Sequence, residues 1–483
     1  RNTNKVYHKY NGLIFLNTTN SNFIYMKRNL ILMFFLAIFC QLNAQNIVGE
    51  WSGELDIQGT KLPLVFRISK TDKGFTTTID SPMQGVKDIP TGQTDFSNNQ
   101  LTIVASKMMM EYKGVLENNA IQGTFTQGGM SLPLNLQAGT GAVKMNRPQQ
   151  PKAPFDYMIE DVSFVNPKDK NTLAGTFTYP KNKKDFPVVV LITGSGAQNR
   201  DSELFGHKAF WVIADDFAKK GIGVLRLDDR GTGSSSKGSM HDTSENFATD
   251  ISTAVDFLFQ KGYKNIGLAG HSEGGMIAPI TALMNQKVKF LISMAGPGIP
   301  IDELMVLQTQ AVLKSQGATE EEVQRTSENN RKLYSFVKNY KGANLENDTK
   351  QFLIKEFTNA NPDKKIDSEI EEQINSQVFQ ITYPWFVYFL KYNPDTNWSK
   401  IKIPVLAING DKDIHVLAKE NLDGIKKSLD KAQNKKVTLK TFENLNHLLQ
   451  TCKVCSVEEY AELEETISPN VLQTISDWIL SLK

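Results

Sequence analysis

Short runs in which apolar and polar residues alternate or cluster fill residues 45–138. Turn residues separate these runs at spacings of roughly 8–14 residues, as in consecutive antiparallel strands. The pattern predicts a small β-barrel or sandwich built from EWSGELDIQ, LPLVFRISK, GFTTTID, LTIVAS, MEYKGVLEN, AIQGTFTQG and LPLNLQAG. No Ser/His/Asp set or cluster of metal ligands is visible in this stretch. We interpret it as an accessory domain that packs or contacts a partner, with ligand holding as the alternative.

A different pattern follows residues 139–156, which are rich in Gly, Pro and Gln and are predicted to form a linker. Continuous Val/Ile/Leu runs then alternate with stretches of helical period. The runs are EDVSFVNP, LAGTFTYP, PVVVLITGSG, IGVLRLDD, NIGLAGHS, VKFLISMAG, IPVLAING and VTLKTFE. This alternation predicts an α/β domain over residues 157–300 and 401–483, with a mostly parallel sheet and helices on both faces.

Residues 301–400 interrupt this alternation. They contain mixed helical stretches, IDELMVLQTQAVLKSQG, TEEEVQRTSENNRKLYSFVKNY and DTKQFLIKEF, and then the aromatic YPWFVYFLKY. A connection of this length needs structure of its own. We therefore predict a helical cap inserted into the α/β domain.

The N-terminal segment differs in charge from the rest of the chain. The formal net charge is +2, but residues 1–44 hold five basic side chains and no acidic one. The remainder is close to neutral, which gives no indication of nucleic-acid binding.

Within this segment, Met26-Lys27-Arg28 precedes an apolar run from Leu30 to Cys40, and Ala44 provides a cleavage point. This order is that of a signal peptide over residues 26–44, and the run is too short to span a bilayer. A buried core helix is the alternative. Residues 1–25 are interpreted as an over-extended N-terminus. We expect an exported protein, periplasmic or secreted, without stable membrane insertion.

Cys452 and Cys455 are the only cysteines that remain after such cleavage. In an exported protein, C-x-x-C is compatible with a small disulfide loop, and free thiols are the alternative. A metal site would need further Cys or His residues nearby, and no thioredoxin-like pattern accompanies the pair.

Ser272 lies in Gly270-His271-Ser272-Glu273-Gly274, between a predicted strand and a predicted helix. The G-x-S-x-G pattern alone is weak, but this context is that of a nucleophile elbow. The elbow raises the serine above the sheet and needs small residues for close backbone approach. We interpret Ser272 as the nucleophile; the alternative is a purely structural turn.

A serine nucleophile needs a base. In a fold of this kind the acid and then the histidine follow the serine along the chain. His447, in ENLNHLLQ after the last predicted strand, fits that order, and His415 is the competitor. The acid that orients the histidine is predicted to be Asp413, with Asp411 as second choice, because both lie in the turn after IPVLAING.

The oxyanion hole requires two backbone N–H groups. We predict the amides of Glu273 and Ser195, the latter in TGSGAQNRD at the end of an earlier strand. The Glu273 side chain is expected to contact a polar or cationic substrate, or to pair with Arg200 or Arg230. The stretch RLDDRGTGSSSKG is interpreted as a structural turn with charged hydrogen bonds near the site.

The stretch YPWFVYFL places Trp385, Tyr388 and Phe389 on one face at helical spacing. This face either packs the cap onto the catalytic domain or lines an acyl or aromatic pocket above Ser272. We keep these three residues as candidate substrate-binding residues.

The motifs LITGSGAQNRD, VLRLDDRGTGSSS, GLAGHSEGGMIAP, INGDKDIHV and NLNHLLQ occur in the order found in bacterial α/β-hydrolases of the serine esterase type, which this chain resembles. The similarity extends to the serine aminopeptidase-like and prolyl-oligopeptidase-like branches and leaves the β-rich N-terminal stretch outside. It implies a triad of Ser272, Asp413 and His447. Many relatives have His-Gly where this chain has Thr193-Gly194.

Together these patterns predict an exported serine hydrolase that cleaves carboxylic esters through an acyl-enzyme. The substrate would be a small ester or peptide, with no metal, organic cofactor or nucleic acid required. A peptidase of the serine aminopeptidase or prolyl oligopeptidase type, or an acyl-thioesterase, is the alternative. A different class, a binding module with an inert hydrolase domain, would be marked by a disrupted triad, which the sequence does not contain.

Overall fold

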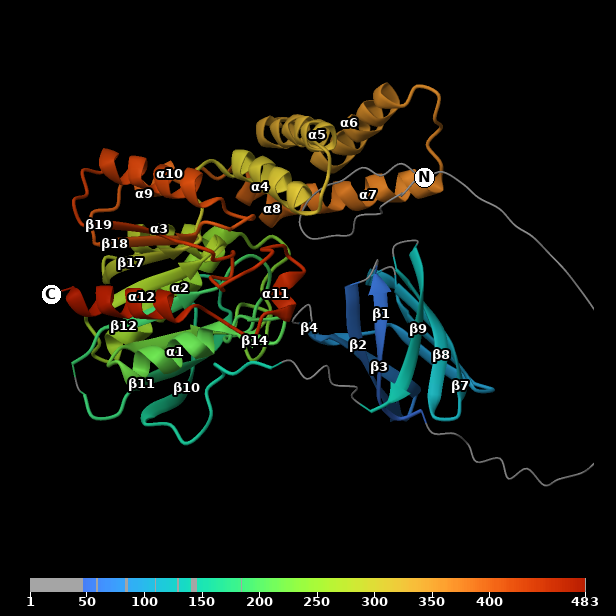
Figure 1. The fold of residues 1–483 in the computed structure, drawn as a ribbon, viewed down its shortest axis with the longest axis horizontal. Helices are drawn as coiled ribbons and strands as arrows, with labels where there is room; N and C mark the ends of the chain where they lie inside the picture. Colours follow the sequence, from blue (N-terminus) through green and yellow to red (C-terminus); the bar gives the residue numbers. More distant parts are fainter. Residues whose placement is uncertain are drawn as a thin grey trace, which may run out of the picture. The chain divides into compact units, whose positions relative to one another are not determined.

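The described residues form two compact units, one within residues 1–143 and the other within residues 144–483, shown in Figure 1. A computed structural model describes residues 47–57, 60–82, 86–108, 110–127, 130–139, 146–183 and 185–482. The predicted signal peptide, residues 26–44, and the segment before it lie outside the described residues.

The N-terminal unit is one antiparallel sheet in the order β4-β3-β2-β1-β9-β8-β7-β6-β5. Asn pairs at two of its hairpin turns have positive φ, 49° and 61° at Asn98-Asn99 and 49° and 64° at Asn118-Asn119, as tight two-residue hairpins require. The elements are β1 (Gly49–Ile57), β2 (Thr60–Thr71), β3 (Gly74–Ser81), β4 (Val86–Pro90), β5 (Gln93–Ser97), β6 (Gln100–Ala105), a 3-10 helix (Ser106–Met108), β7 (Met110–Glu117), β8 (Ala120–Gln127) and β9 (Met130–Ala138).

This sheet curls into a half-barrel. The Thr91 amide and hydroxyl donate to Thr77 O at 3.1 and 2.8 Å, which brings the start of β5 against β3. Phe66, Leu101 and Tyr112 are fully buried in the apolar interior. The predicted barrel therefore describes this unit better than the predicted sandwich. The pattern did not reveal β4 and β5.

The second unit contains a sheet in the order β10-β11-β15-β12-β16-β17-β18-β19. The strands from β15 to β19 in this order are parallel, and β10 and β11 join antiparallel at one edge. Their bounds are Tyr157–Val165 (β10), Thr172–Pro180 (β11), Val188–Ile192 (β12), Gly223–Leu227 (β15), Ile266–His271 (β16), Val288–Met294 (β17), Val405–Gly410 (β18) and Val437–Phe442 (β19); a small hairpin adds β13 (Glu203–Leu204) and β14 (His207–Lys208).

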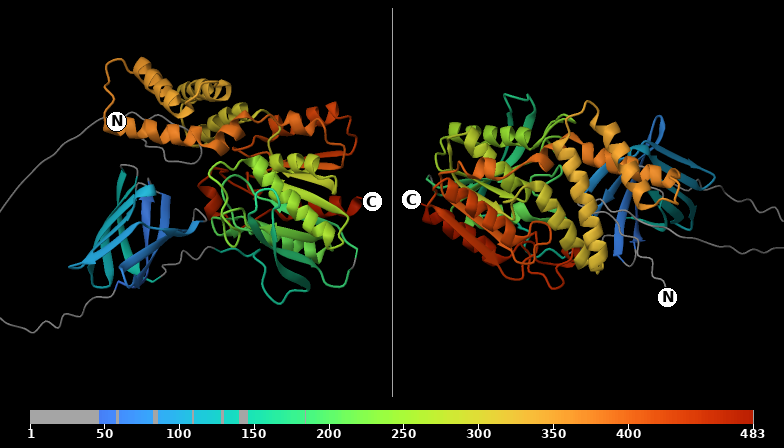
Figure 2. Two further views of the ribbon diagram at one scale, coloured as in Figure 1. Left: turned by 180° about the vertical axis from the view of Figure 1, so that it is seen from behind. Right: turned by 90° about the horizontal axis from the view of Figure 1, so that it is seen from above.

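Helices cover both faces of this sheet, as the continuous apolar strands predicted (Figures 1 and 2). Val189 and Leu191 of β12 share one hydrophobic core with α1 (Ala209–Lys219) and α12 (Pro469–Ser481). Val190, equally buried, points to the opposite face. That face carries α2 (Ser244–Gln260), α3 (Glu273–Met284) and α10 (Ala418–Lys431).

A helical cap lies between β17 and β18, where the sequence predicted one. Figure 1 shows its helices grouped together, in yellow and orange. They are α4 (Ile301–Ser315), α5 (Glu320–Asn339), α6 (Leu345–Ala360), α7 (Ser368–Thr382) and α8 (Pro384–Lys391), followed by a short α9 (Asp395–Trp398). In the part of the chain that the structure describes, every helix is too short or too polar to cross a membrane.

The predicted linker, residues 139–156, is anchored to the second unit over part of its length. The Arg147 guanidinium donates to the carbonyl oxygens of Phe205, Ala461 and Leu463 at 2.7 to 3.0 Å. Gln149 exchanges hydrogen bonds with the backbone of Ile467. From Arg147 onward the segment therefore belongs structurally to the second unit.

Candidate active site

Ser272 sits at a sharp turn between β16 and α3, with φ 54° and ψ −121°. Its N–H donates to Met294 O at 2.9 Å, and its carbonyl accepts from Gly275 at 2.8 Å. A Cβ at Gly270 would lie 2.0 Å from Gly274 O, and one at Gly274 would lie 2.3 Å from a carbonyl of β12. The two flanking glycines are thus sterically required, and the turn has the geometry of a nucleophile elbow.

The structure brings His447 and Asp413 together. His447 Nδ1 lies 2.8 Å from Asp413 Oδ2, and both side chains are buried. The other carboxylate oxygen, Oδ1, accepts the backbone N–H groups of His415 and Val416, each at 2.8 Å. An Nδ1–H···carboxylate bond fixes the tautomer and leaves His447 Nε2 able to accept a proton.

Asp411, the second choice for the acid, lies elsewhere. Its Oδ1 accepts the Asn444 N–H at 2.6 Å, and its Oδ2 pairs with Lys412 at 3.0 Å. The Asp411 carboxylate therefore stabilises the loop before His447 and does not contact the His447 imidazole.

His447 also lies beside the elbow. His271 Nε2 donates to His447 O at 2.9 Å, and the two rings are 4.9 Å apart. Among the described residues, no hydrogen bond joins the Ser272 hydroxyl to the His447 ring. Such bonds often tighten only when substrate is bound, so the arrangement is compatible with general-base chemistry.

The competing histidine, His415, flanks His447 on another side, with ring centroids 5.0 Å apart. Its Nδ1 accepts from Gln308 Nε2 of cap helix α4 at 3.0 Å. Burial, with a smaller contribution from the charge of His447, lowers the pKa of His415 to about 3. The ring is therefore neutral at ordinary pH, and its Nδ1 is already hydrogen-bonded to the cap.

The loop after β12 lies against the elbow, because a Cβ at Gly194 would be 3.2 Å from Ser272 Cβ. Ser195 next to it is exposed. Asp229 holds this loop from behind, accepting the Thr193 hydroxyl at 2.8 and 2.9 Å and the Gln198 N–H at 2.9 Å. Burial raises the pKa of Asp229 to about 7. Thr193 thus anchors the loop.

Glu273 is the first residue of α3, so its N–H lacks a partner within the helix. The residue is 2 % exposed, and its carboxylate accepts hydrogen bonds from Ser244 Oγ at 2.6 Å and from Trp385 Nε1 at 2.9 Å. Burial raises the pKa of Glu273, and the hydrogen bonds from Ser244 and Trp385 oppose this rise.

The ion pairs expected for Glu273 are not formed, because both candidate partners are used elsewhere. Arg200 pairs with Asp228 at 2.7 Å. Arg230 pairs with Asp169, Asp242 and Asp250 at 2.8 to 3.0 Å. The predicted salt bridge was wrong, and RLDDRGTGSSSKG forms a charged, hydrogen-bonded turn as predicted.

The aromatic face of the cap reaches the elbow through α8. Trp385 stacks on Phe389 with ring centroids 5.3 Å apart and an interplanar angle of 13°. Phe389 is buried, whereas Trp385 and Tyr388 are half-buried. Burial raises the pKa of Tyr388 to about 12, with the charges of Glu245 and Glu273 contributing. The three aromatic residues therefore include two that remain partly open beside the elbow.

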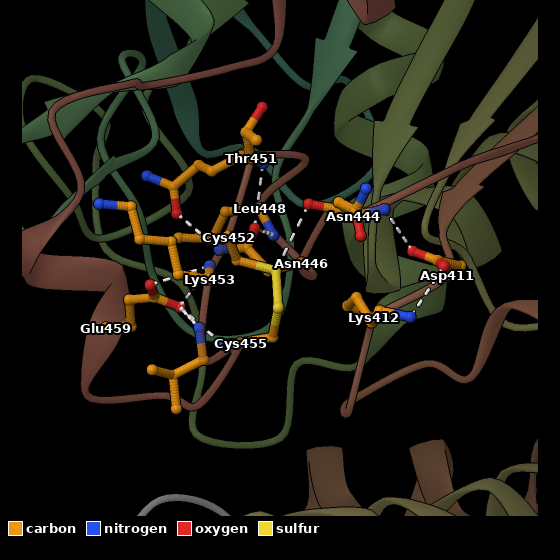
Figure 3. The surroundings of a disulfide bond; sticks show 12 residues. Asp411, Lys412, Asn444, Asn446, Leu448, Thr451, Cys452, Lys453, Cys455 and Glu459 are labelled. Atoms are coloured by element: carbon orange, nitrogen blue, oxygen red, sulfur yellow. Dashed lines mark hydrogen bonds and ion pairs between the residues drawn. A yellow bond between two sulfur atoms is a disulfide. The ribbon is translucent and has the colours of Figure 1, made fainter.

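A disulfide joins Cys452 to Cys455 just beyond the His447 loop, as Figure 3 shows. The Glu459 carboxylate, at the start of α11 (Glu459–Glu462), accepts the N–H groups of the disulfide loop at 2.6 to 3.2 Å. Cys452 N donates to Asn444 O at 3.0 Å. These bonds stabilise the His447 loop, and of the two alternatives for the cysteine pair the structure has the disulfide loop.

The sheet, the elbow and the inserted cap define an α/β-hydrolase. Residues 207–451 match the family described as serine aminopeptidase, S33, and the chain belongs to this family.

Among curated relatives, Esterase EstD of Thermotoga maritima is 25% identical over 311 residues, 64% of this chain and 66% of the esterase. The aligned region thus spans slightly less than two thirds of that protein. Among solved structures, an esterase of Pyrococcus furiosus is 16% identical, with coverage of 70% of this chain and 98% of that one and a TM-score of 0.40. Est1E of Butyrivibrio proteoclasticus, with ferulic acid bound, is 17% identical, with coverage of 66% and 98% and a TM-score of 0.38.

Proposed function

We propose that the protein is an exported serine hydrolase that cleaves carboxylic esters, with Ser272, His447 and Asp413 as its triad. The observation that carries the proposal is the 2.8 Å contact between His447 Nδ1 and Asp413 Oδ2 beside the strained Ser272 turn.

In the first half of the reaction, His447 Nε2 takes the Ser272 proton while Oγ attacks the ester carbonyl. The N–H groups of Glu273 and Ser195 stabilise the oxyanion. His447 then gives its proton to the departing alkoxide, so an alcohol leaves and the acyl group stays on Ser272. A water molecule, deprotonated by His447, attacks this acyl-enzyme, and the serine regains its proton as the acid departs.

Ester substrates are favoured because the curated relative is named an esterase. The family description, in contrast, is that of an aminopeptidase, so peptide cleavage is the second candidate. The same acyl-enzyme chemistry also serves a thioesterase. A panel of p-nitrophenyl esters, aminoacyl-nitroanilides and an acyl thioester separates these cases. We expect kcat/KM to be highest on an ester, and higher turnover of a nitroanilide would reassign the protein to the peptidases.

Export is proposed on the basis of residues 26–44. A disulfide between Cys452 and Cys455 is compatible with an oxidising compartment. N-terminal sequencing of the mature protein should begin near Gln45. Recovery of a chain that retains Met26 would contradict this part of the proposal.

A further inference from the structure

Glu273 connects three parts of the catalytic unit through one carboxylate. It begins α3 directly after Ser272, and it accepts hydrogen bonds from Ser244 at the start of α2 and from Trp385 in the cap. Its own N–H is one of the two proposed oxyanion donors, and the loop after β12 that carries the other lies against Ser272. The elbow, helix α2 and the cap therefore meet at a single side chain.

The side chain is also nearly inaccessible. The Glu273 residue is 2 % exposed, and no salt bridge to it occurs within the described residues. Removing an acid from water is costly unless hydrogen bonds satisfy it, and here an indole N–H and a hydroxyl do so. A buried carboxylate with two neutral donors is poorly suited to bind a cationic substrate and well suited to hold Glu273 in a fixed position relative to those donors.

Asp229 provides a comparison on the same loop. It accepts the Thr193 hydroxyl and the Gln198 N–H, so it fixes both ends of the segment that contains Ser195. Its side-chain bonds stay within the α/β domain. Glu273, in contrast, is the carboxylate that binds the cap.

We propose that the Glu273 side chain is a positioning group that couples the seating of the cap to the geometry of the oxyanion hole. This inference rests on the proposed function, because it assumes that the Glu273 N–H serves the oxyanion. When Trp385 donates to the carboxylate, α8 is seated, and the same bond fixes Glu273, and with it the N–H directly after Ser272, at the position that the transition state needs. Small displacements of such donors are costly, since the oxyanion forms only in the transition state.

The test compares variants that keep or remove the acceptor. Glu273→Met is similar in volume but accepts no hydrogen bond, whereas Glu273→Gln retains the oxygen that Ser244 and Trp385 contact. Trp385→Phe removes the indole donor and retains an aromatic ring. Trp478→Phe on α12, where the indole packs against Phe290, is the matched control.

With a p-nitrophenyl ester, Glu273→Met should lower kcat by about tenfold to a hundredfold with KM changed less than about threefold. Glu273→Gln should restore most of this loss, and Trp478→Phe should leave kcat unchanged. Trp385→Phe should lower kcat in the same direction, and Glu273→Met combined with it should be no worse than Glu273→Met alone, because both changes break one link.

Independent, multiplying losses in the double variant would overturn the coupling. So would a normal kcat in Glu273→Met, or a loss confined to KM. If Glu273→Met does not fold, Trp385→Phe and Glu273→Gln still decide: a normal kcat in Trp385→Phe overturns the proposal. Failure of the proposed function looks different, since the unaltered protein would then show no ester turnover at all.

Discussion

Ser272 adopts a backbone conformation that costs a residue other than glycine about 1–3 kcal/mol, and interactions with the surrounding structure offset this strain. The hydrogen bonds to Met294 and Gly275 fix the turn, and the absence of Cβ atoms at Gly270 and Gly274 allows it. The serine side chain therefore projects from a rigid base. Asp413 likewise fixes the position of His447, because its other carboxylate oxygen, Oδ1, accepts two backbone N–H groups.

The acid assignment can be tested by paired variants. Asp413→Asn should lower kcat by a factor on the order of 10⁴, because the amide favours the wrong histidine tautomer. Asp411→Asn should have a much smaller effect, since this carboxylate contacts Asn444 and Lys412 instead of the imidazole. Steady-state kinetics on one ester gives both numbers. A larger loss for Asp411→Asn would reverse the assignment.

His207 allows a pH prediction away from the site. Burial, and then the charge of Arg147, lowers the pKa of His207 to about 4, against 6.5 when exposed. Between pH 4 and pH 6.5 the unfolded chain binds more protons than the folded chain. The contribution of His207 to the free energy of unfolding is therefore present above pH 6.5 and is lost as the pH falls toward 4. His207→Gln should reduce the slope of unfolding free energy against pH by up to about 1.4 kcal/mol per unit.

Urea unfolding at several pH values between 4 and 7 measures this slope. His241→Gln is the matched control, since His241 is exposed. Equal slopes in the protein and in His207→Gln would contradict the prediction.

At the scale of elements, the cap and the α/β domain meet at residues next to the triad. Helix α8 contacts Glu273 beside Ser272, and α4 contacts His415 beside His447. Neither contact was predictable from the sequence, because no local pattern marks Gln308 or pairs Trp385 with Glu273, and the partners are distant in the chain. The helical spacing of YPWFVYFL did predict one aromatic face on α8.

This face gives a prediction about selectivity. Trp385→Phe and Trp385→Ala both remove the bond to Glu273, but only Trp385→Ala removes the ring. Compared with Trp385→Phe, Trp385→Ala should lower kcat/KM on long-chain or aromatic esters by a further factor of about ten to a hundred, because the apolar contact with the ring is lost. On acetate esters the two variants should be similar. An equal further loss on every ester, with a lowered Tm, would identify the ring as core.

The strands show why some elements are predictable and others are not. Continuous apolar runs such as VVVLI of β12 can only be buried strands or helices, and flanking Pro and Gly limit them to strand length. In contrast, β4 and β5 are short and polar and are separated by Thr91 and Gly92, so their pairing depends on the curl of the sheet. The elbow was predictable because its glycines are required locally.

At the scale of the whole molecule, the two units carry separate apolar cores. A chain that starts at Asn146 keeps Arg147 and Gln149, which bind the catalytic unit. We expect this chain to retain activity on a small ester. A chain that starts at Phe155 lacks both anchors and should have a lower Tm. Loss of activity in a well-folded Asn146 chain would show that the N-terminal unit contributes to the site.

The central claim is that Ser272 is an activated nucleophile, and covalent labelling with a fluorophosphonate tests it most directly. The account predicts that intact-mass spectrometry will show one label per folded chain, on the peptide containing Ser272, and none in Ser272→Ala. Unlabelled, well-folded protein, or a label on another serine, would contradict it.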